Sequence, residues 1–474
     1  MLRPAYGRNH LYGATTLRTT MLDKQYEEMR SEVLPMLAKA RYFSIVTDGW
    51  ESQSRQHLIN IIIHTPNNHP IYYKSINTTS ESLNSEKLAE ILCSVAEEIG
   101  KARWLSVVTD NASVNLAAAK IIEKTLPSVF MVGCDSHSYN LLIKDVYCIK
   151  NSPVIHDLIE RANLIVTFIV SHRDLRVPFE EVRQRFGITS GLKQKCDTRF
   201  ATNFLVMESL SNNRNTLNEL VFKYKEVWAV IRSEQKNRVQ EAIKDPTFWE
   251  SIDVLLGILK PIADLINQSE SDNIYVESTY KNWMELKNKL EHVKLHELIE
   301  RKVLLELVHY RWNFIHVPVH AFAYILNPAT ASKAMCKGFC PIRRKKFDDY
   351  RDTIKQLKEH FRDFYNDKVL EEQAYSEYEE FCQKSDEDTT KNPRAYWSTF
   401  GVRDFPVLAK VALRIFQVQT SAASAERCWS ILGFIETKSR NNLNTGTLDK
   451  LAFLKINAAL KDNKLDPVHQ EGFF

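Results

Sequence analysis

The chain has 474 residues, of which 44% are hydrophobic and 26% are charged, and its formal net charge is +4. This composition is typical of an ordinary globular protein and excludes a strongly basic tail that binds nucleic acid through bulk charge alone. The eight cysteines contain no Cys-x-x-Cys pair, and no apolar run resembles a signal core or a membrane span. We therefore expect an intracellular protein with reduced thiols.

The first third of the chain predicts a mixed α/β sheet. Short β-branched runs alternate first with turns and then with amphipathic helices. In chain order we expect a helix over 23–39, a strand from 43 that ends in a turn at Asp48-Gly49, strands over 57–65 and 71–78, a helix over 85–99, a strand over 105–110, a helix over 112–124 and a strand over 129–134. Three consecutive strands followed by alternation with helices predict an antiparallel meander joined to a parallel part.

The rest of the chain is almost wholly helical in its periodicity. Apolar residues recur at helical spacing from about 155 to 414, and two final helices are expected over 421–435 and 447–459. The predicted fold class is α/β, a mixed five-stranded sheet interrupted by a large all-helical insertion.

Two predicted strands end in the same short sequence, Val46-Thr-Asp48 and Val108-Thr-Asp110. Carboxylates at neighbouring strand ends can share divalent cations, because Mg²⁺ prefers hard oxygen ligands. Two such ions can activate a water or a 3′-hydroxyl and stabilise the leaving oxygen of a phosphodiester. The alternative is structural, since aspartate also ends strands as a turn former or a helix N-cap.

Several ordered blocks resemble those of hAT-superfamily DNA transposases, in the subgroup with a "domain of unknown function 659" segment. In the first half these blocks are TDGW at 47–50, VTDN at 108–111, and GCDSH at 133–137 followed by Asn140-Leu141. The stretch at 311–328 resembles the helical insertion of that family. Residues 397–457, with TSAASAERCWS at 420–430 and KSRNNL at 438–443, resemble its C-terminal dimerisation region.

The resemblance implies a ribonuclease-H-like core and a metal-binding triad. Asp48 and Asp110 match the first two acidic residues of the family and Glu426 matches the third. These three would be catalytic and would bind two Mg²⁺ or Mn²⁺ ions. The implied domains are an N-terminal helical segment (1–40), the first part of the core (41–195), a helical insertion domain (196–405), and the core completion with the dimerisation region (406–474).

The sequence around Glu426 supports its placement on a helix that packs on the sheet. A stripe at helical spacing runs beside it, formed by Ala425, Cys428, Trp429, Leu432 and Ile435. The alternative is a surface glutamate in a well-formed helix.

The resemblance also implies DNA contacts. His137 would lie near the active site and contact DNA, and Lys438 and Arg440 are candidate phosphate contacts. Arg199 and Phe200 match a block in which the family has Arg-Trp, whose tryptophan stacks on a displaced base. Phe200 offers a smaller aromatic face for the same role, although a core aromatic is the alternative.

Two further patterns have open interpretations. Cys134 and His137 form half of a possible zinc site, but no second pair of ligands is evident. The basic run RRKK at 343–346 has three possible interpretations: a nuclear-import signal, a phosphate contact, or a solvated loop.

We expect a nuclear protein that binds DNA, namely transposon ends and flanking duplex, and forms a homodimer or higher oligomer, with no membrane association. The apolar face of the last helix fits either a dimer contact or an intramolecular core. Transposases of this family usually begin with a BED-type zinc finger, and this sequence shows no such motif. Two other functions remain open: a non-catalytic DNA-associated or dimerisation protein derived from a transposase, and a related nuclease such as a ribonuclease H.

Overall fold

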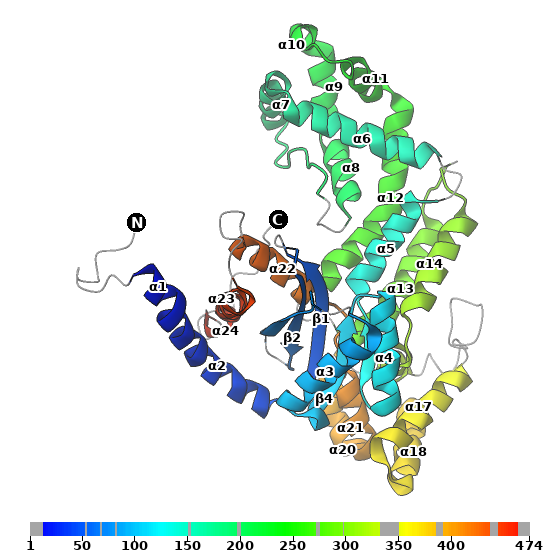
Figure 1. The fold of residues 1–474 in the computed structure, drawn as a ribbon. Coiled ribbons are helices and arrows are strands. Elements are labelled where there is room, and N and C mark those ends of the chain that lie inside the picture. Colours follow the sequence, from blue (N-terminus) through cyan, green and yellow to red (C-terminus); the bar gives the residue numbers. More distant parts are fainter. Residues whose placement is uncertain are drawn as a thin grey trace. The chain divides into compact units, whose positions relative to one another are not determined.

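The computed structural model describes residues 13–52, 55–66, 69–80, 83–149, 153–196, 201–271, 275–296, 298–331, 350–384, 392–436 and 444–462. The chain divides into two compact units (Figure 1). The sheet unit contains Met1–Cys134, Ser269–Tyr280 and Val317–Phe474, and the helical unit contains Asp135–Gln268 and Lys281–His316. The sheet unit is therefore assembled from three separate segments of the sequence.

The sheet unit is built on one five-stranded mixed sheet of order β3-β2-β1-β4-β5. Strand β1 pairs antiparallel with β2 and parallel with β4, while β2 and β3 are antiparallel and β4 and β5 are parallel. The strands are β1 (Phe43–Glu51), β2 (His57–His64), β3 (Ile71–Asn77), β4 (Trp104–Thr109) and β5 (Phe130–Gly133). This confirms the predicted ribonuclease-H-like arrangement of an antiparallel meander joined to two parallel strands.

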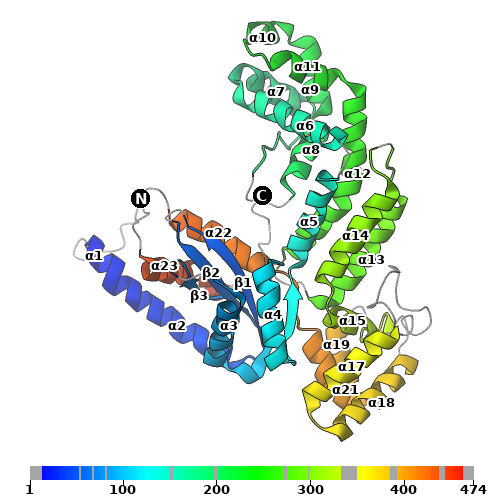
Figure 2. The same ribbon diagram turned by 45° about the vertical axis from the view of Figure 1, so that its right-hand side comes forward.

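Helices cover both faces of the sheet, which is why β2 and β4 read as nearly continuous apolar runs. Helices α3 (Ser85–Ile99) and α4 (Ser113–Thr125) lie together on one face (Figures 1 and 2). Helices α22 (Ala423–Ile435) and α23 (Thr445–Asn457) lie on the other face, and α2 (Leu22–Lys39) packs against α23. The sheet is thus completed by residues from the last tenth of the chain.

Polar side chains fix the ends of these helices. The Asn84 side chain accepts a hydrogen bond from Lys87 N at 2.8 Å and caps the start of α3. The same helix ends at Gly100, whose φ of 125° is accessible mainly to glycine. Arg103 then donates to the carbonyls of Leu37 and Ala40, so it satisfies free acceptors at the end of α2.

The remaining helices of the sheet unit surround a buried aromatic cluster around Trp397, whose indole donates to Leu326 O at 2.8 Å. Glu377 is buried, and one of its oxygens accepts from the backbone N–H groups of Val407 and Leu408, at the positive end of α21. These helices are α15 (Pro318–Ile325), α17 (Tyr350–Tyr365), α18 (Lys368–Lys384), α19 (Pro393–Tyr396), α20 (Val402–Asp404) and α21 (Pro406–Ile415).

The helical unit has its own core, in which Trp283 stacks on Tyr139 with ring centroids 4.9 Å apart. Arg311 and Asp145 form an ion pair with two hydrogen bonds in the same unit. The helices are α5 (Asp135–Tyr147), α6 (Pro153–Ser171), α7 (Arg173–Arg185), α8 (Thr202–Asn212), α9 (Arg214–Lys223), α10 (Lys225–Val230), α11 (Lys236–Lys244), α12 (Pro246–Ser269), α13 (Val276–His292) and α14 (Arg301–Ile315). This bears out the predicted large helical insertion.

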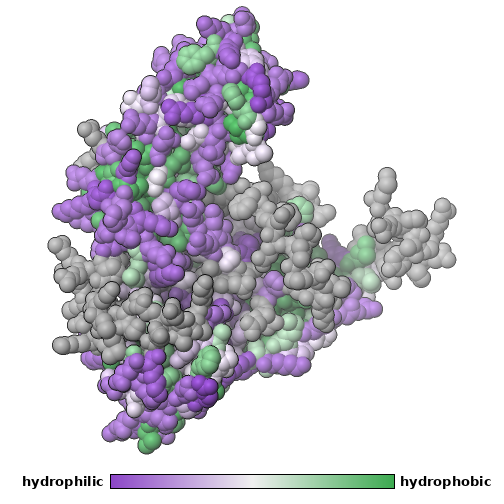
Figure 3. Space-filling model, turned by 180° about the vertical axis from the view of Figure 1, so that it is seen from behind, coloured by the Kyte–Doolittle hydropathy of each residue, from purple (hydrophilic) through white to green (hydrophobic). Residues whose placement is uncertain are grey.

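The face of the molecule shown in Figure 3 is largely hydrophilic, with small separate apolar areas. Within the described ranges, no helix combines the length and the apolar character that a membrane crossing requires.

The predicted end of the first strand is wrong, and the structure decides part of the question about the last helix. Strand β1 does not end at Asp48 but continues to Glu51, because β2 continues to pair with it opposite Asp48, Gly49 and Trp50. The predicted apolar face of the last helix is an intramolecular core face in part, since Leu448 and Ala452 of α23 are buried within this chain. These two side chains are therefore not available to a partner subunit.

Candidate active site

The two predicted aspartates lie at the same edge of the sheet on neighbouring parallel strands. Val46 of β1 is paired with Val108 of β4, and each aspartate comes two residues after its valine. Asp48 lies within β1 opposite Asn60, whereas Asp110 directly follows the end of β4. The parallel pairing thus brings together two carboxylates that are 62 positions apart in the sequence.

Asp110 also has the structural role that strand-end aspartates often have. Its Oδ1 atom accepts a hydrogen bond from Ala112 N at 3.0 Å and another from the Asn115 side chain. These bonds connect the end of β4 to the start of α4. The turn-forming and site-forming roles coexist, because both of these hydrogen bonds go to one oxygen of the carboxylate.

Glu426 lies in the first turn of α22, which packs against β1 and β2. The buried Asn60 side chain joins this helix to the first aspartate. Its Oδ1 accepts from Asp48 N at 3.0 Å and its Nδ2 donates to Ala425 O at 2.7 Å. One amide group therefore sets the position of β1 relative to the residue that precedes Glu426.

The carboxyl groups repel one another electrostatically. Burial raises the pKa of Glu426 to about 8, with further contributions from the charges of Asp48, Glu270 and Asp110. Burial also raises the pKa of Asp48 to about 6, assisted by Asp110 and opposed by a hydrogen bond from Trp429. Shifts of this direction arise where carboxylates share a poorly solvated site, and such groups often lie at functional sites.

Glu270 is a fourth carboxyl group of this cluster that the sequence interpretation did not identify. Burial raises its pKa, and the neighbouring Arg427 guanidinium lowers it. Arg427 also donates to Glu270 O at 2.6 Å, which ties the 269–280 segment to α22. Nothing in the sequence around Glu270 distinguishes it from a surface glutamate that follows a helix.

The predicted apolar stripe of α22 is confirmed for four of its members. Ala425, Cys428, Leu432 and Ile435 are buried. Trp429 is different, because its indole N–H donates to Asp48 Oδ2 at 2.8 Å. It contributes to the site as well as to the packing of the helix.

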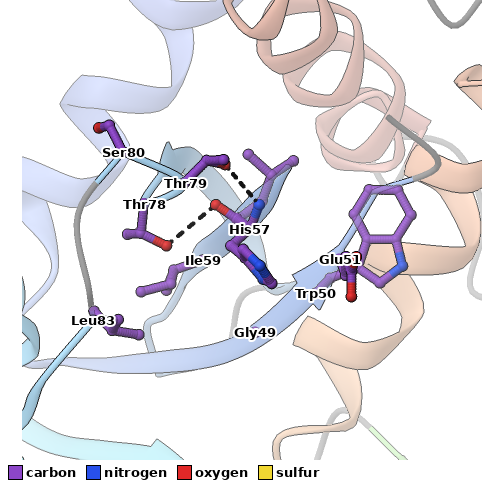
Figure 4. Close-up of a pocket in the computed structure, with 10 residues that line it drawn as sticks. Gly49, Trp50, Glu51, His57, Ile59, Thr78, Thr79, Ser80 and Leu83 are labelled. Carbon is purple, nitrogen blue, oxygen red and sulfur yellow. Dashed lines mark hydrogen bonds between the residues drawn. The ribbon is translucent and has the colours of Figure 1, made fainter. Parts of the chain in front are cut away.

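Two adjoining cavities open beside Asp48. The smaller, of about 200 Å³, is bordered by both Asp48 and Asp110. The larger, of about 620 Å³, begins at the residue after Asp48 and is shown in Figure 4. It is lined by Gly49, Trp50, Glu51, His57, Leu58, Ile59, Thr78, Thr79, Ser80 and Leu83. The cavities share Gly49, Ile59 and Leu83, so they adjoin each other, and Asp48 and Asp110 border the smaller one.

The GCDSH block has a close backbone approach at its glycine. A Cβ atom at Gly133 would overlap the Asn111 side-chain oxygen, next to Asp110. Cys134 is buried, and its sulfur accepts a hydrogen bond from Ala422 N at 3.2 Å. Cys134 thus joins the end of β5 to the segment that leads into α22.

Of the residues predicted to contact DNA, the structure describes only His137. His137 lies half-buried on α5 in the helical unit. Arg199, Phe200, Lys438 and Arg440 lie outside the described residues, as does the basic run at 343–346. Their proposed DNA contacts and the import signal stay predictions.

In the part of the chain that the structure describes, no three His, Cys, Asp or Glu side chains are close enough to form a preassembled metal cage. The proposed triad therefore consists of coupled carboxyl groups that a cation would have to draw together.

The fold and the site together define a class: a ribonuclease-H-like protein with acidic side chains at one edge of its sheet. Residues 13–165 match the family model "Domain of unknown function (DUF659)", and residues 373–458 match the model "hAT family C-terminal dimerisation region". The chain is an hAT-family transposase-like protein. The search of curated proteins found no match to it.

Proposed function

We propose that this protein cuts and joins DNA by divalent-metal-dependent phosphoryl transfer, with Asp48, Asp110 and Glu426 as the catalytic triad. The observation that carries the proposal is the placement of these carboxyl groups: Asp48 and Asp110 follow paired residues of parallel strands, and Glu426 lies in the first turn of the helix that packs on β1 and β2. Structural carboxylates are normally paired with cations or exposed to water, because leaving them close together and only partly solvated costs stability. Metal binding would explain why the protein keeps these carboxyl groups close together despite the loss of stability.

The donor set suits Mg²⁺ or Mn²⁺, because these ions favour carboxylate oxygens and retain sites for water and phosphate. Two ions would supply Lewis acidity, stabilising charge on the attacking and leaving oxygens of the phosphodiester. The protein would hold the three carboxylate ligands in position through its backbone and the Asn60 side chain. Asp48 and Asp110 lie on paired strands, and the Asn60 side chain links Asp48 to the helix of Glu426.

The proposed substrate is duplex DNA, with transposon ends and their flanks as the specific case. The C-terminal dimerisation region supports oligomer formation, and we propose a homodimer or higher oligomer that acts in the nucleus. The larger hollow, of about 620 Å³, begins at the residue after Asp48, and hydroxyl groups of Thr78, Thr79 and Ser80 border it. The alternative is a transposase-derived protein that associates with DNA without cutting it, which is favoured by phenylalanine at position 200, where the family has tryptophan.

The deciding experiment measures cleavage and strand transfer on duplex and pre-nicked DNA, with Mg²⁺, Mn²⁺ or no metal. Asp48→Asn and Glu426→Gln each replace a carboxyl group by an amide with little change in size. Glu123→Gln is the matched control, because Glu123 is an exposed carboxylate on α4 away from the site. Thermal unfolding verifies that every variant is folded.

We expect metal-dependent activity in the wild type and in the control, and its loss in both site variants. Folded wild-type protein that binds DNA but never cuts it, even as pre-nicked ends, would overturn catalysis in favour of the non-catalytic alternative. Selective cleavage of an RNA–DNA hybrid would instead identify a ribonuclease H.

A further inference from the structure

Among the described residues, the Trp429 indole is the only side chain from another element that donates a hydrogen bond to the Asp48 carboxylate. Its Nε1 lies 2.8 Å from Asp48 Oδ2, and the two residues are 381 positions apart in the sequence. The other oxygen, Oδ1, accepts from the backbone N–H of Gly49 at 3.0 Å. Each oxygen therefore has one fixed donor and keeps lone-pair capacity for a further partner.

A second indole supports the first. Trp50 stacks on Trp429 with ring centroids 5.3 Å apart and planes inclined by 19°. Because side chains alternate along a strand, Trp50 and Asp48, two residues apart on β1, project to the same side. Figure 4 shows the Trp50 indole lying apart from Thr78, Thr79 and Ser80. Trp429 is thus held by a stacking contact and by its hydrogen bond.

The chemistry of the donor matters. A lysine or arginine at position 429 would neutralise Asp48 and compete with a cation for its oxygens. An indole N–H is an uncharged donor that can orient a carboxylate without cancelling its charge. Outer hydrogen bonds of this kind commonly orient metal-binding carboxylates.

Trp429 also lies three residues after Glu426 on α22, and residues at this spacing are neighbours on a helix surface. The bond to Asp48 therefore fixes not only one carboxylate but also the helix that carries another. Packing alone would not require this bond, since the buried stripe of Ala425, Cys428, Leu432 and Ile435 already attaches α22 to the sheet.

We infer that Trp429 is a positioning residue that orients Asp48 for cation binding, with Trp50 as its stacking support. This inference rests on the proposed metal-dependent function. It assigns to Trp429 a role that requires the indole N–H rather than the bulk of the ring.

The test uses Trp429→Phe, which removes the N–H and keeps an aromatic ring against Trp50. Trp397→Phe is the matched control, because it removes an indole bond of the same length, 2.8 Å, in the same unit. Mn²⁺ affinity is measured by titration in the absence of DNA, and cleavage is measured as kcat and KM. Urea unfolding verifies that each variant is folded.

For Trp429→Phe we expect Mn²⁺ affinity to fall about 10-fold, as for the loss of other outer-shell partners. We expect kcat to fall with it while KM for DNA stays unchanged. Trp50→Phe keeps the donor and shrinks the stacking partner, and should weaken Mn²⁺ binding only about 2- to 3-fold. Trp397→Phe should alter stability alone.

A second readout does not depend on activity. With ¹⁵N-labelled tryptophan, the indole signal that disappears in Trp429→Phe should shift when Mg²⁺ is added to the wild type. Wild-type affinity for Mn²⁺ in folded Trp429→Phe would overturn the positioning role and leave the proposed function intact. A wild-type protein that binds no Mn²⁺ would overturn the proposed function itself, and the two failures are thereby distinguished.

Discussion

The side-chain amide of Asn60 donates a hydrogen bond to the carbonyl of Ala425, a residue 365 positions later in the chain. The same amide accepts from Asp48 N, and Asn60 O accepts from the Thr47 hydroxyl at 2.8 Å. Asn60 is fully buried. A polar side chain within an otherwise apolar strand thus connects the first and last parts of the candidate active site.

Replacing Asn60 with alanine should both destabilise the protein and weaken the site. Two buried backbone groups, Asp48 N and Ala425 O, would lose their partners, which costs about 2–4 kcal/mol of unfolding free energy. Asn457→Ala is the matched control, because the buried Asn457 side chain bonds Tyr72 N and O, both at 2.9 Å, away from the carboxylates. Urea unfolding should show similar losses, whereas Mn²⁺ binding should fall only for Asn60→Ala. Equal Mn²⁺ affinity in the two variants would contradict the proposed link.

Glu426→Gln should stabilise the metal-free protein at alkaline pH. The folded pKa of Glu426 is raised to about 8 from an ordinary value of 4.5. Between these values the folded state holds a proton that the unfolded state releases, so the unfolding free energy falls as pH rises. The variant lacks this loss and should exceed the wild type by about 2–4 kcal/mol at pH 8, and by little at pH 4. Denaturant unfolding at both pH values, without divalent ions, makes the comparison. A wild type as stable as the variant at pH 8 would show that the carboxyl group is not strained.

His360 should make the protein sensitive to acid. Its ring lies among Phe130, Phe322 and Phe364, and burial, followed by the charge of Arg414, lowers its pKa to about 3. The unfolded state takes up a proton near pH 6.5 and the folded state does not, so stability is lost as pH falls from 6.5 towards 3.

We expect this histidine to account for about 3 kcal/mol of the stability lost between pH 7 and pH 4. The His360→Phe variant should lack that part of the loss. Urea unfolding of both proteins across this range isolates the contribution, since every other group is common to them. Parallel stability curves would argue against a neutral, buried imidazole.

Gly133→Ala should disturb the second aspartate through its neighbour. The added Cβ would overlap the Asn111 side chain, so Asn111 must move, at a cost of about 1–3 kcal/mol, and cleavage should fall with it. Gly433→Ala is the control, because no atom lies within 4 Å of an added Cβ in that helix. It should stabilise the protein by about 0.5–1 kcal/mol and leave cleavage unchanged. Thermal unfolding and the DNA cleavage assay provide the two readouts.

Much of the sheet could be predicted from local sequence, because strand and helix periodicities are properties of short segments. The helix that apolar spacing predicts over 85–99 has these bounds in the structure, where Asn84 and Gly100 cap its two ends. The extent of β1 was not, because its last residues depend on pairing with β2 rather than on their own apolar pattern.

The site was only partly predictable for the same reason. Local sequence does not distinguish Asp48 and Asp110 from turn-forming aspartates or Glu426 from a surface glutamate, and only the family resemblance indicates a triad. The roles of Asn60 and Trp429 depend on contacts across more than 360 residues, and no local pattern indicates such a partner. In the sequence, Trp429 is one more member of an apolar stripe. Only the structure shows that its indole N–H donates to Asp48. Glu270 has no distinguishing signal at all.

The three-segment construction of the sheet unit has a consequence for synthesis of the protein. The 365 residues that separate Asn60 from Ala425 take roughly 20–70 seconds to translate at about 5–20 residues per second. Until then a nascent chain has both aspartates but neither α22 nor the glutamate it carries. A message that is cut short or spliced within that interval yields a product with an incomplete site. Under the proposed function, DNA would therefore encounter cutting activity only from a chain that has been translated past Glu426.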